Sequence, residues 1–273
     1  MIQNGLKPIA LDLRDYSAAR TFGSVAPHTF AENYSVDTGK TMADQNADGL
    51  FQGCTGYTQT DNLVDEMGSI LKASYTYFKT CMMEGHGYNQ GCDIRTSLKS
   101  TQVYGVQELA ETTDQEAEKH RGGKYFNVYN DGGLDWFDSV RSAVFINQKG
   151  ASCGSPWFPI WEQVGSDGII LMPPLNQIQS PDSLPWHNYS CKGWKTINGV
   201  PYLMIKSWQG VNYGAKGWCY MSREVANKVF EIRGSGIFMQ AHANTEDIQT
   251  IKVSILEQAI TFLLMIIGLK RLN

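Results

Sequence analysis

The pattern of hydrophobic and polar positions divides the chain into a helical first half and a β-rich second half. From Cys54 onward, apolar positions recur at helical spacing. After Gly150, short apolar and aromatic runs alternate with Gly, Pro and Asn, which is typical of antiparallel strands joined by turns. We predict helices at about 54–67, 69–80, 94–102, 108–121 and 136–147, and strands at about 151–158, 168–172, 188–197, 202–207 and 218–221.

The two ends of the chain differ from this body. Residues 1–40 carry prolines and turn signals, so we expect an extended arm before a helical lobe at 41–148 and a β-rich lobe at 149–245. Residues 246–273 contain a nearly continuous apolar run from 259 to 269. That run is about half of the roughly 20 residues that a membrane-spanning helix needs. We expect a helix that packs on its own domain or on a sister chain, with membrane contact as the alternative.

Composition restricts the class of protein. With 42% hydrophobic residues in 273, the chain can bury a substantial core. A net charge of -4 without a long basic run argues against nucleic acid as a partner. The N-terminus lacks the basic and apolar regions of a signal peptide. Six cysteines are too sparse for a disulfide scaffold, so we expect free thiols and a cytoplasmic location.

Cys81, His86 and Cys92 lie close in sequence and include ligand types that bind metals. Their spacing matches no standard zinc pattern, so the sequence predicts no metal and no cofactor.

Cys54 is the candidate nucleophile. A Gly-rich loop leads into it and a predicted helix leaves from it, and a helix N-terminus stabilises a thiolate. A cysteine nucleophile also needs a histidine that shares its proton. His187 lies in the β-rich half, about 130 residues downstream, which is within the interval typical of papain-type enzymes. We therefore predict that Cys54 and His187 face each other across a cleft between the lobes.

The stretch from Tyr202 to Trp218, YLMIKSWQGVNYGAKGW, resembles a motif of the papain-like (C1) cysteine peptidase family. With Ser207 at the position of the family asparagine, the glycines and aromatic residues of the motif align without a gap. The segments 91–99 and 104–106 also resemble family members, in particular C1-like proteins of bacteria and phages. The resemblance implies an α+β, two-lobed papain-like fold, with a central helix starting at Cys54 and an antiparallel, barrel-like β lobe.

The resemblance also assigns roles. It implies a peptidase acting on peptide or isopeptide bonds, with the catalytic residues Cys54, His187, Ser207 and Gln45 and the substrate-binding residues Gly53 and Trp208. In these roles Ser207 orients the imidazole through its hydroxyl and Gln45 supports the oxyanion. Trp208 shields the histidine.

Several features depart from the family pattern. Gln45 as the oxyanion residue requires a three-residue loop insertion, and Gln52 is its rival. If Gln52 and Gly53 are aligned with the family Gln-Gly pair, the nucleophile position falls on Thr58 and the chain is an inactive relative. The residues before the helical lobe are also too few for the long inhibitory pro-segment that the family usually carries.

Two hypotheses follow. The first is a cysteine peptidase that hydrolyses peptide or protein substrates in the cytoplasm. The second is a weakly active or inactive structural or assembly protein on the same fold, possibly part of a phage virion. Self-association or membrane contact through residues 250–273 belongs to this second hypothesis.

Overall fold

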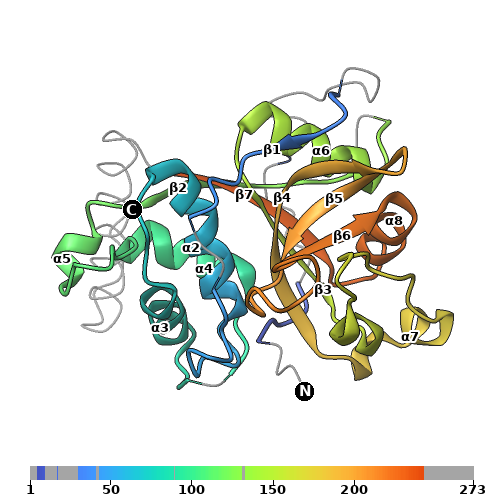
Figure 1. Ribbon diagram of the computed structural model, residues 1–273. Coiled ribbons are helices and arrows are strands. Elements are labelled where there is room, and N and C mark those ends of the chain that lie inside the picture. Colours follow the sequence, from blue (N-terminus) through green and yellow to red (C-terminus); the bar gives the residue numbers. More distant parts are fainter. Residues whose placement is uncertain are drawn as a thin grey trace, which may run out of the picture.

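The computed structural model describes residues 5–9, 17, 30–40, 43–88, 90–130 and 133–242. Within these residues it combines helices with an antiparallel sheet (Figure 1). The elements are β1 (Tyr34–Ser35), α2 (Cys54–Met67), α3 (Ala73–Glu84), α4 (Ile94–Tyr104), α5 (Asp114–Ala117), β2 (Gly122–Asn127), α6 (Trp136–Asn147), β3 (Ala151–Pro156), η2 (Pro159–Gln163), α7 (Leu175–Gln179), η3 (Pro181–Ser183), β4 (Trp186–Ile197), β5 (Val200–Lys206), β6 (Trp218–Ser222), α8 (Arg223–Phe230) and β7 (Gly236–His242).

Helices and strands separate into two lobes, as predicted. Figure 1 shows α2, α3 and α4 on one side and the strands β3 to β6 on the other. The sheet has the order β2-β7-β3-β4-β5-β6, and β1 pairs with β4. The predicted hairpin between β4 and β5 is confirmed, because Asn198 and Gly199 both take positive φ angles, of 51° and 77°.

Helix α2 lies at the centre of the molecule. Every residue from Cys54 to Val64 is buried, because α3 covers one side of the helix and the sheet covers another. Gly56 permits the close approach of α3. A Cβ at Gly56 would lie 2.6 Å from the Cβ of Tyr77. The central helix that the sequence predicted is therefore present and begins at Cys54.

The predicted helix at 108–121 shrinks to the short helix α5. Leu109 donates its N–H to the carbonyl of Ile70, which holds the preceding chain in an extended path. Thr113 and Glu116 then form a capping box, so the helix starts only at Asp114. The predicted strand at 168–172 is an isolated bridge at Ile169. In both places contacts with distant segments override the local pattern.

Two elements in the range predicted as the helical lobe join the sheet instead. β2 pairs with β7, and α6 packs against α8 and β4. The main hydrophobic core accordingly joins side chains of α2, α6 and α8 to the sheet. Strand β2 escaped the sequence analysis because its partner β7 lies more than a hundred residues downstream.

A buried charged cluster fastens α2 to the sheet. Lys192 of β4 is fully buried and its Nζ lies 2.5 Å from an oxygen of Asp61 and 2.6 Å from one of Asp65. Lys206 of β5 pairs with Asp61 at 3.3 Å and with Asp37. Burial by itself lowers the pKa of Lys192, but the two carboxylates of α2 outweigh that effect and raise it. The lysine is therefore held charged between the lobes.

The predicted C-terminal helix at 246–273 lies outside the described residues. Among the helices that are described, none has the length and apolar character needed to cross a bilayer.

Candidate active site

Cys54 is the first residue of α2. Gly53 is the N-cap and donates its N–H to the carbonyl of Leu50 (2.8 Å), so the loop turns directly into the helix. Thr58 lies one turn further along, and its hydroxyl donates to the Cys54 carbonyl (2.8 Å). The position at the helix start, where the dipole favours a thiolate, is occupied by Cys54 and not by Thr58.

His187 lies near the start of β4 and is fully buried. Its Nε2 is 2.9 Å from the backbone carbonyl of Ser207. A carbonyl only accepts, so Nε2 carries the proton in this bond and Nδ1 presents a lone pair. Nδ1 is buried without a hydrogen-bond partner. The sequence analysis expected the Ser207 hydroxyl to orient the ring, and the acceptor is the main-chain oxygen of that residue instead.

The residue after His187 brings β4 to the sulfur. Asn188 donates its backbone N–H to the Sγ of Cys54 over 3.4 Å. Its side-chain amide is anchored on β3, with bonds to the Ser152 hydroxyl (3.1 Å) and the Cys153 carbonyl (2.7 Å). The helix start and the strand of His187 thus lie side by side, whereas Nδ1 of His187 has no hydrogen-bond partner in the described part of the chain, the Cys54 sulfur included. No sequence signal pointed to Asn188, because its contact with Cys54 is made by the backbone N–H and not by the side chain.

The aromatic ring against His187 comes from Trp157, for which the sequence predicted no role. The ring of Trp157 packs edge-on against His187, with centroids 4.7 Å apart. Trp208, the predicted shield, is buried and points toward α2, where its indole N–H donates to the Thr58 hydroxyl (2.8 Å). Its backbone has a positive φ of 62°, which is unusual for a bulky residue. Trp208 therefore fixes the loop that carries the Ser207 carbonyl rather than covering the imidazole.

Gln45 is buried in the loop before α2. Its backbone N–H donates to the Trp208 carbonyl (3.0 Å), and its side-chain nitrogen reaches the Phe51 carbonyl over 3.4 Å. Its side-chain oxygen is buried without a partner. This amide lies beside the chain entering Cys54, whereas Gln52, its rival, is only partly buried.

A segment far away in the sequence covers the site. Residues 5–9, which we call the arm segment, run between the two lobes beside the N label in Figure 1. On the helical side, Cys92 donates its N–H to Gly5 (2.6 Å) and accepts from Lys7 (3.2 Å). On the β side, Leu6 donates to the carbonyl of Trp186 (3.2 Å).

The arm segment lies against the candidate nucleophile itself. The backbone of Gly5 lies near enough to the Cys54 sulfur to lower its pKa, and it passes so close to Gln52 that a Cβ at Gly5 would lie 1.8 Å from the Gln52 carbonyl oxygen. Ile9 completes the path by donating to the carbonyl of Gly234 (2.8 Å). The arm segment thus lies over Cys54, a contact for which the sequence carries no local signal.

Burial keeps the cysteine and histidine neutral. It raises the pKa of Cys54 to about 11, and backbone N–H groups, including that of Asn188, offset only part of the effect. Burial lowers the pKa of His187 to about 4, against the smaller opposite effect of its bond to Ser207. At neutral pH the covered site holds a thiol and a neutral imidazole.

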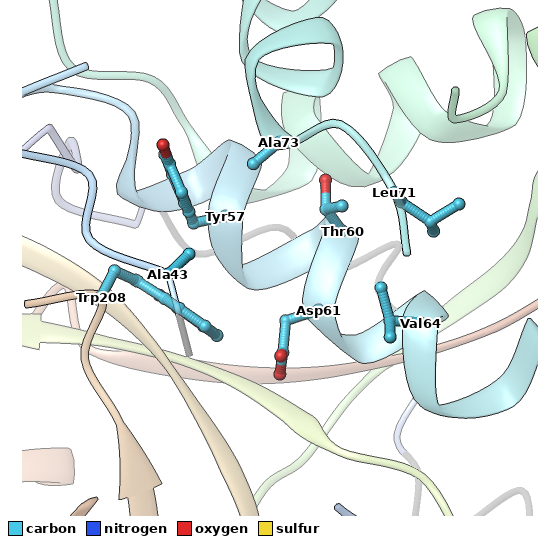
Figure 2. Close-up of a pocket in the computed structure, with 8 residues that line it drawn as sticks. All are labelled: Ala43, Tyr57, Thr60, Asp61, Val64, Leu71, Ala73 and Trp208. Carbon is cyan, nitrogen blue, oxygen red and sulfur yellow. The ribbon is translucent and has the colours of Figure 1, made fainter. Parts of the chain in front are cut away.

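A small pocket lies on the side of α2 that faces Trp208 (Figure 2). Its cavity volume is about 30 Å³, room for roughly one water molecule, so it is too small for a peptide side chain. The lining residues are Ala43, Tyr57, Thr60, Asp61, Val64, Leu71, Ala73 and Trp208.

Comparison with known proteins supports the fold. No protein-family model matches the sequence, and no curated protein matches it. The structure is similar to xylellain, a cysteine protease from Xylella fastidiosa, with a TM-score of 0.66 and 16% identity over 89% of this chain and 97% of that one. It is also similar to procathepsin L2 from the larval midgut of Tenebrio molitor, with a TM-score of 0.62 and 14% identity over 85% and 76%. For procathepsin B from Trypanosoma congolense the TM-score is 0.56, with 11% identity over 88% and 87%. The predicted α+β architecture is confirmed, and the chain has the papain-like fold of these cysteine proteases.

Proposed function

We propose that the protein is a cysteine peptidase that hydrolyses peptide or isopeptide bonds through Cys54 and His187. One observation carries the proposal: a thiol at the N-terminus of the central helix accepts a hydrogen bond from the residue next to a buried histidine with a free Nδ1. This arrangement supplies a nucleophile, a base and a fixed ring tautomer.

The reaction follows from these atoms. Nδ1 of His187 takes the thiol proton, and the Cys54 thiolate attacks the carbonyl carbon of the scissile bond. The backbone N–H of Cys54 and the side-chain amide of Gln45 stabilise the oxyanion. As the C–N bond breaks, His187 gives its proton to the leaving amine and a thioester remains. His187 then accepts a proton from water, whose oxygen attacks the thioester and releases the acid and the thiol.

In this mechanism the arm segment must leave before a substrate binds. The N–H and C=O of Cys92 and the C=O of Trp186 hold the arm segment through backbone bonds, and these groups suit an extended peptide equally well. Opening also lets water reach the catalytic pair. Hydration lowers the pKa of Cys54 and raises that of His187, because burial is the main cause of both shifts.

The test is active-site labelling of the full chain. Iodoacetamide is applied at mildly acidic pH, where a cysteine paired with histidine reacts faster than an ordinary thiol, and the modified residues are mapped by mass spectrometry. We expect Cys54 to react first and hydrolysis of unfolded protein substrates to stop in Cys54→Ala. Cys153→Ala is the matched control, because it removes another buried thiol without touching the site. Equal hydrolysis by the Cys54→Ala protein would refute the proposal.

The second candidate is a weakly active or inactive binding or assembly protein on the same fold, such as a virion component. The complete burial of Cys54 and His187, with the backbone of Gly5 lying against the Cys54 sulfur, favours it. It is distinguished by a variant in which the arm segment is loosened. If Cys54 stays no more reactive than the other thiols and no substrate is cut, the assembly role is favoured.

A further inference from the structure

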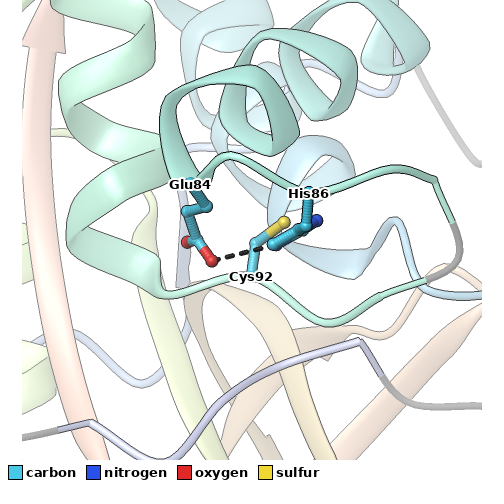
Figure 3. A group of neighbouring side chains, drawn as sticks. All are labelled: Glu84, His86 and Cys92. Atoms are coloured by element: carbon cyan, nitrogen blue, oxygen red, sulfur yellow. Dashed lines mark hydrogen bonds and ion pairs between the residues drawn. The ribbon is translucent and has the colours of Figure 1, made fainter.

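Sulfur, nitrogen and oxygen ligands gather where α3 ends. Gly85 follows Glu84 in a left-handed conformation (φ 73°), so the chain turns back and His86 donates its N–H to the Cys81 carbonyl (3.1 Å). Glu84, His86 and Cys92 then present a carboxylate oxygen, a ring nitrogen and a sulfur within 4.8 Å of one another (Figure 3). The Sγ atoms of Cys81 and Cys92 are 3.8 Å apart. We call Cys81, Glu84, His86 and Cys92 the α3 cluster.

The imidazole of the α3 cluster faces a carboxylate. Nδ1 of His86 lies 2.9 Å from the Gly87 carbonyl, which can only accept, so Nδ1 carries a proton there. Nε2 then points its lone pair at Glu84 Oε2, 3.1 Å away. Two acceptors at this distance need a proton or a cation between them. The other carboxylate oxygen is fixed by the N–H of Asp93 (2.7 Å), as outer partners fix the ligands of metal sites.

The two sulfurs are also arranged for a cation. Both side chains are buried, and their Sγ atoms lie in hydrogen-bond contact with each other. Sulfurs bound to one tetrahedral zinc at about 2.3 Å each lie about 3.8 Å apart. The observed separation of the Sγ atoms has the same value.

We propose that the α3 cluster binds one Zn²⁺ ion through its two sulfurs, Nε2 of His86 and a carboxylate oxygen of Glu84. Thiolate and imidazole ligands favour zinc over magnesium and calcium, which prefer all-oxygen sites. Binding releases the protons of the two thiols and any proton on Nε2. With all four ligands supplied by the protein, the site is structural: it joins the end of α3 to Cys92, whose backbone holds the arm segment.

The arm segment competes for the same carboxylate. Lys7 forms an ion pair with Glu84 Oε2, the oxygen that faces His86. A bound dication repels the ammonium group and takes its acceptor. Zinc binding therefore loosens one contact of the arm segment, and removing the lysine charge strengthens zinc binding.

The experiment uses the full chain carrying Cys54→Ala, so that the thiol of the candidate active site cannot bind metal. The protein is kept reduced with a phosphine and titrated with Zn²⁺ against a chromophoric chelator, and Co²⁺ serves as a spectroscopic substitute. His86→Ala is compared with His120→Ala. His120 is a matched control because its Nε2 also lies 3.1 Å from a carboxylate, that of Glu111, whereas no cysteine among the described residues completes a metal-binding group with this pair.

We expect one zinc per chain and a thiolate-to-cobalt charge-transfer band that weakens in Cys92→Ser, which keeps one of the two thiolates. His86→Ala should weaken zinc binding by more than about 100-fold, beyond the loss of an outer partner, and His120→Ala should not. Lys7→Gln should tighten binding by about 1.5- to 5-fold, the scale of a solvent-accessible ion pair. The proposal is overturned if the parent chain binds no zinc, or if His86→Ala and Cys92→Ser bind it unchanged. Lys7→Gln is expected to increase the affinity for zinc, and misfolding would not produce such an increase. An unchanged affinity in Lys7→Gln would refute the competition between Lys7 and zinc for Glu84.

Discussion

Truncation of Leu6 to alanine should open the candidate active site. The Leu6 side chain is 5% exposed and lies directly over Gly154, where a Cβ would approach its Cδ2 to 2.7 Å. Burying a leucine is worth about 1.5–3 kcal/mol, and the alanine keeps only a small part of this. A loss of about 2 kcal/mol corresponds to a roughly 30-fold larger population in which the arm segment has left Cys54.

Alkylation of Cys54 measures that population. When closing is faster than labelling, the rate follows the open fraction, so Leu6→Ala should label Cys54 about 30-fold faster than the parent chain. Lys7→Gln is the matched control on the same segment. It removes a partly exposed ion pair with Glu84, and we expect an increase of only about 1.5- to 5-fold.

Cys153 reports whether the effect is local. It lies fully buried on β3 and becomes accessible only when the domain itself unfolds. Its labelling rate should not change in Leu6→Ala. An unchanged rate at Cys54, or equal acceleration at Cys54 and Cys153, would show that the arm segment does not control access.

Three further outcomes test other parts of the structure. Lys192→Met should lower the free energy of unfolding in urea by about 3–5 kcal/mol, because buried Asp65 loses its lysine and Asp61 keeps only Lys206. Lys149→Met, at a partly exposed pair, should cost under about 1 kcal/mol, and similar losses in the two variants would contradict the buried pairing. Because His187 is neutral when buried and protonates once unfolded, stability should fall by up to about 3 kcal/mol as the pH drops from its ordinary pKa of 6.5 toward 4, and His187→Gln should remove this part of the pH dependence of the urea midpoint. Gly91→Ala places a Cβ 2.8 Å from the backbone of Gly5, so it should speed Cys54 alkylation without shifting the urea midpoint, and a slower reaction would contradict the arm position.

The parts of the fold that the sequence predicted are those with local signals. Helix α2 begins at Cys54 because a glycine loop ends there, and the hairpin at Asn198 and Gly199 is specified by two residues that accept positive φ. Strand β2 and the shortened helix α5 depend on partners far along the chain. Periodicity over a short window carries no information about such partners.

The site can also be divided into features with local sequence signals and features that depend on distant contacts. Residue types and spacing predict that Cys54 and His187 face each other, and the Asn188 N–H brings the strand of His187 to the Cys54 sulfur. That the Ser207 main chain, and not its hydroxyl, contacts the imidazole depends on the loop conformation set at Trp208. The spacing of Cys81, His86 and Cys92 along the chain matches no standard zinc motif. Glu84 lies beside them only because the chain turns at Gly85, and no linear motif includes it.

The buried lysines between α2 and the sheet also determine how a substrate can enter. Lys192 is fully enclosed, and Lys206 is nearly so, between carboxylates of the opposite lobe and its neighbouring loop. Separation of the lobes would break these ion pairs and leave buried charges without partners before water could solvate them, at a cost of several kcal/mol. The two lobes therefore form one rigid unit, in which the distance between them does not change. For the proposed peptidase, a polypeptide would bind in the space that the arm segment leaves, and selectivity would depend on its fit to a preformed site rather than on movement of the lobes.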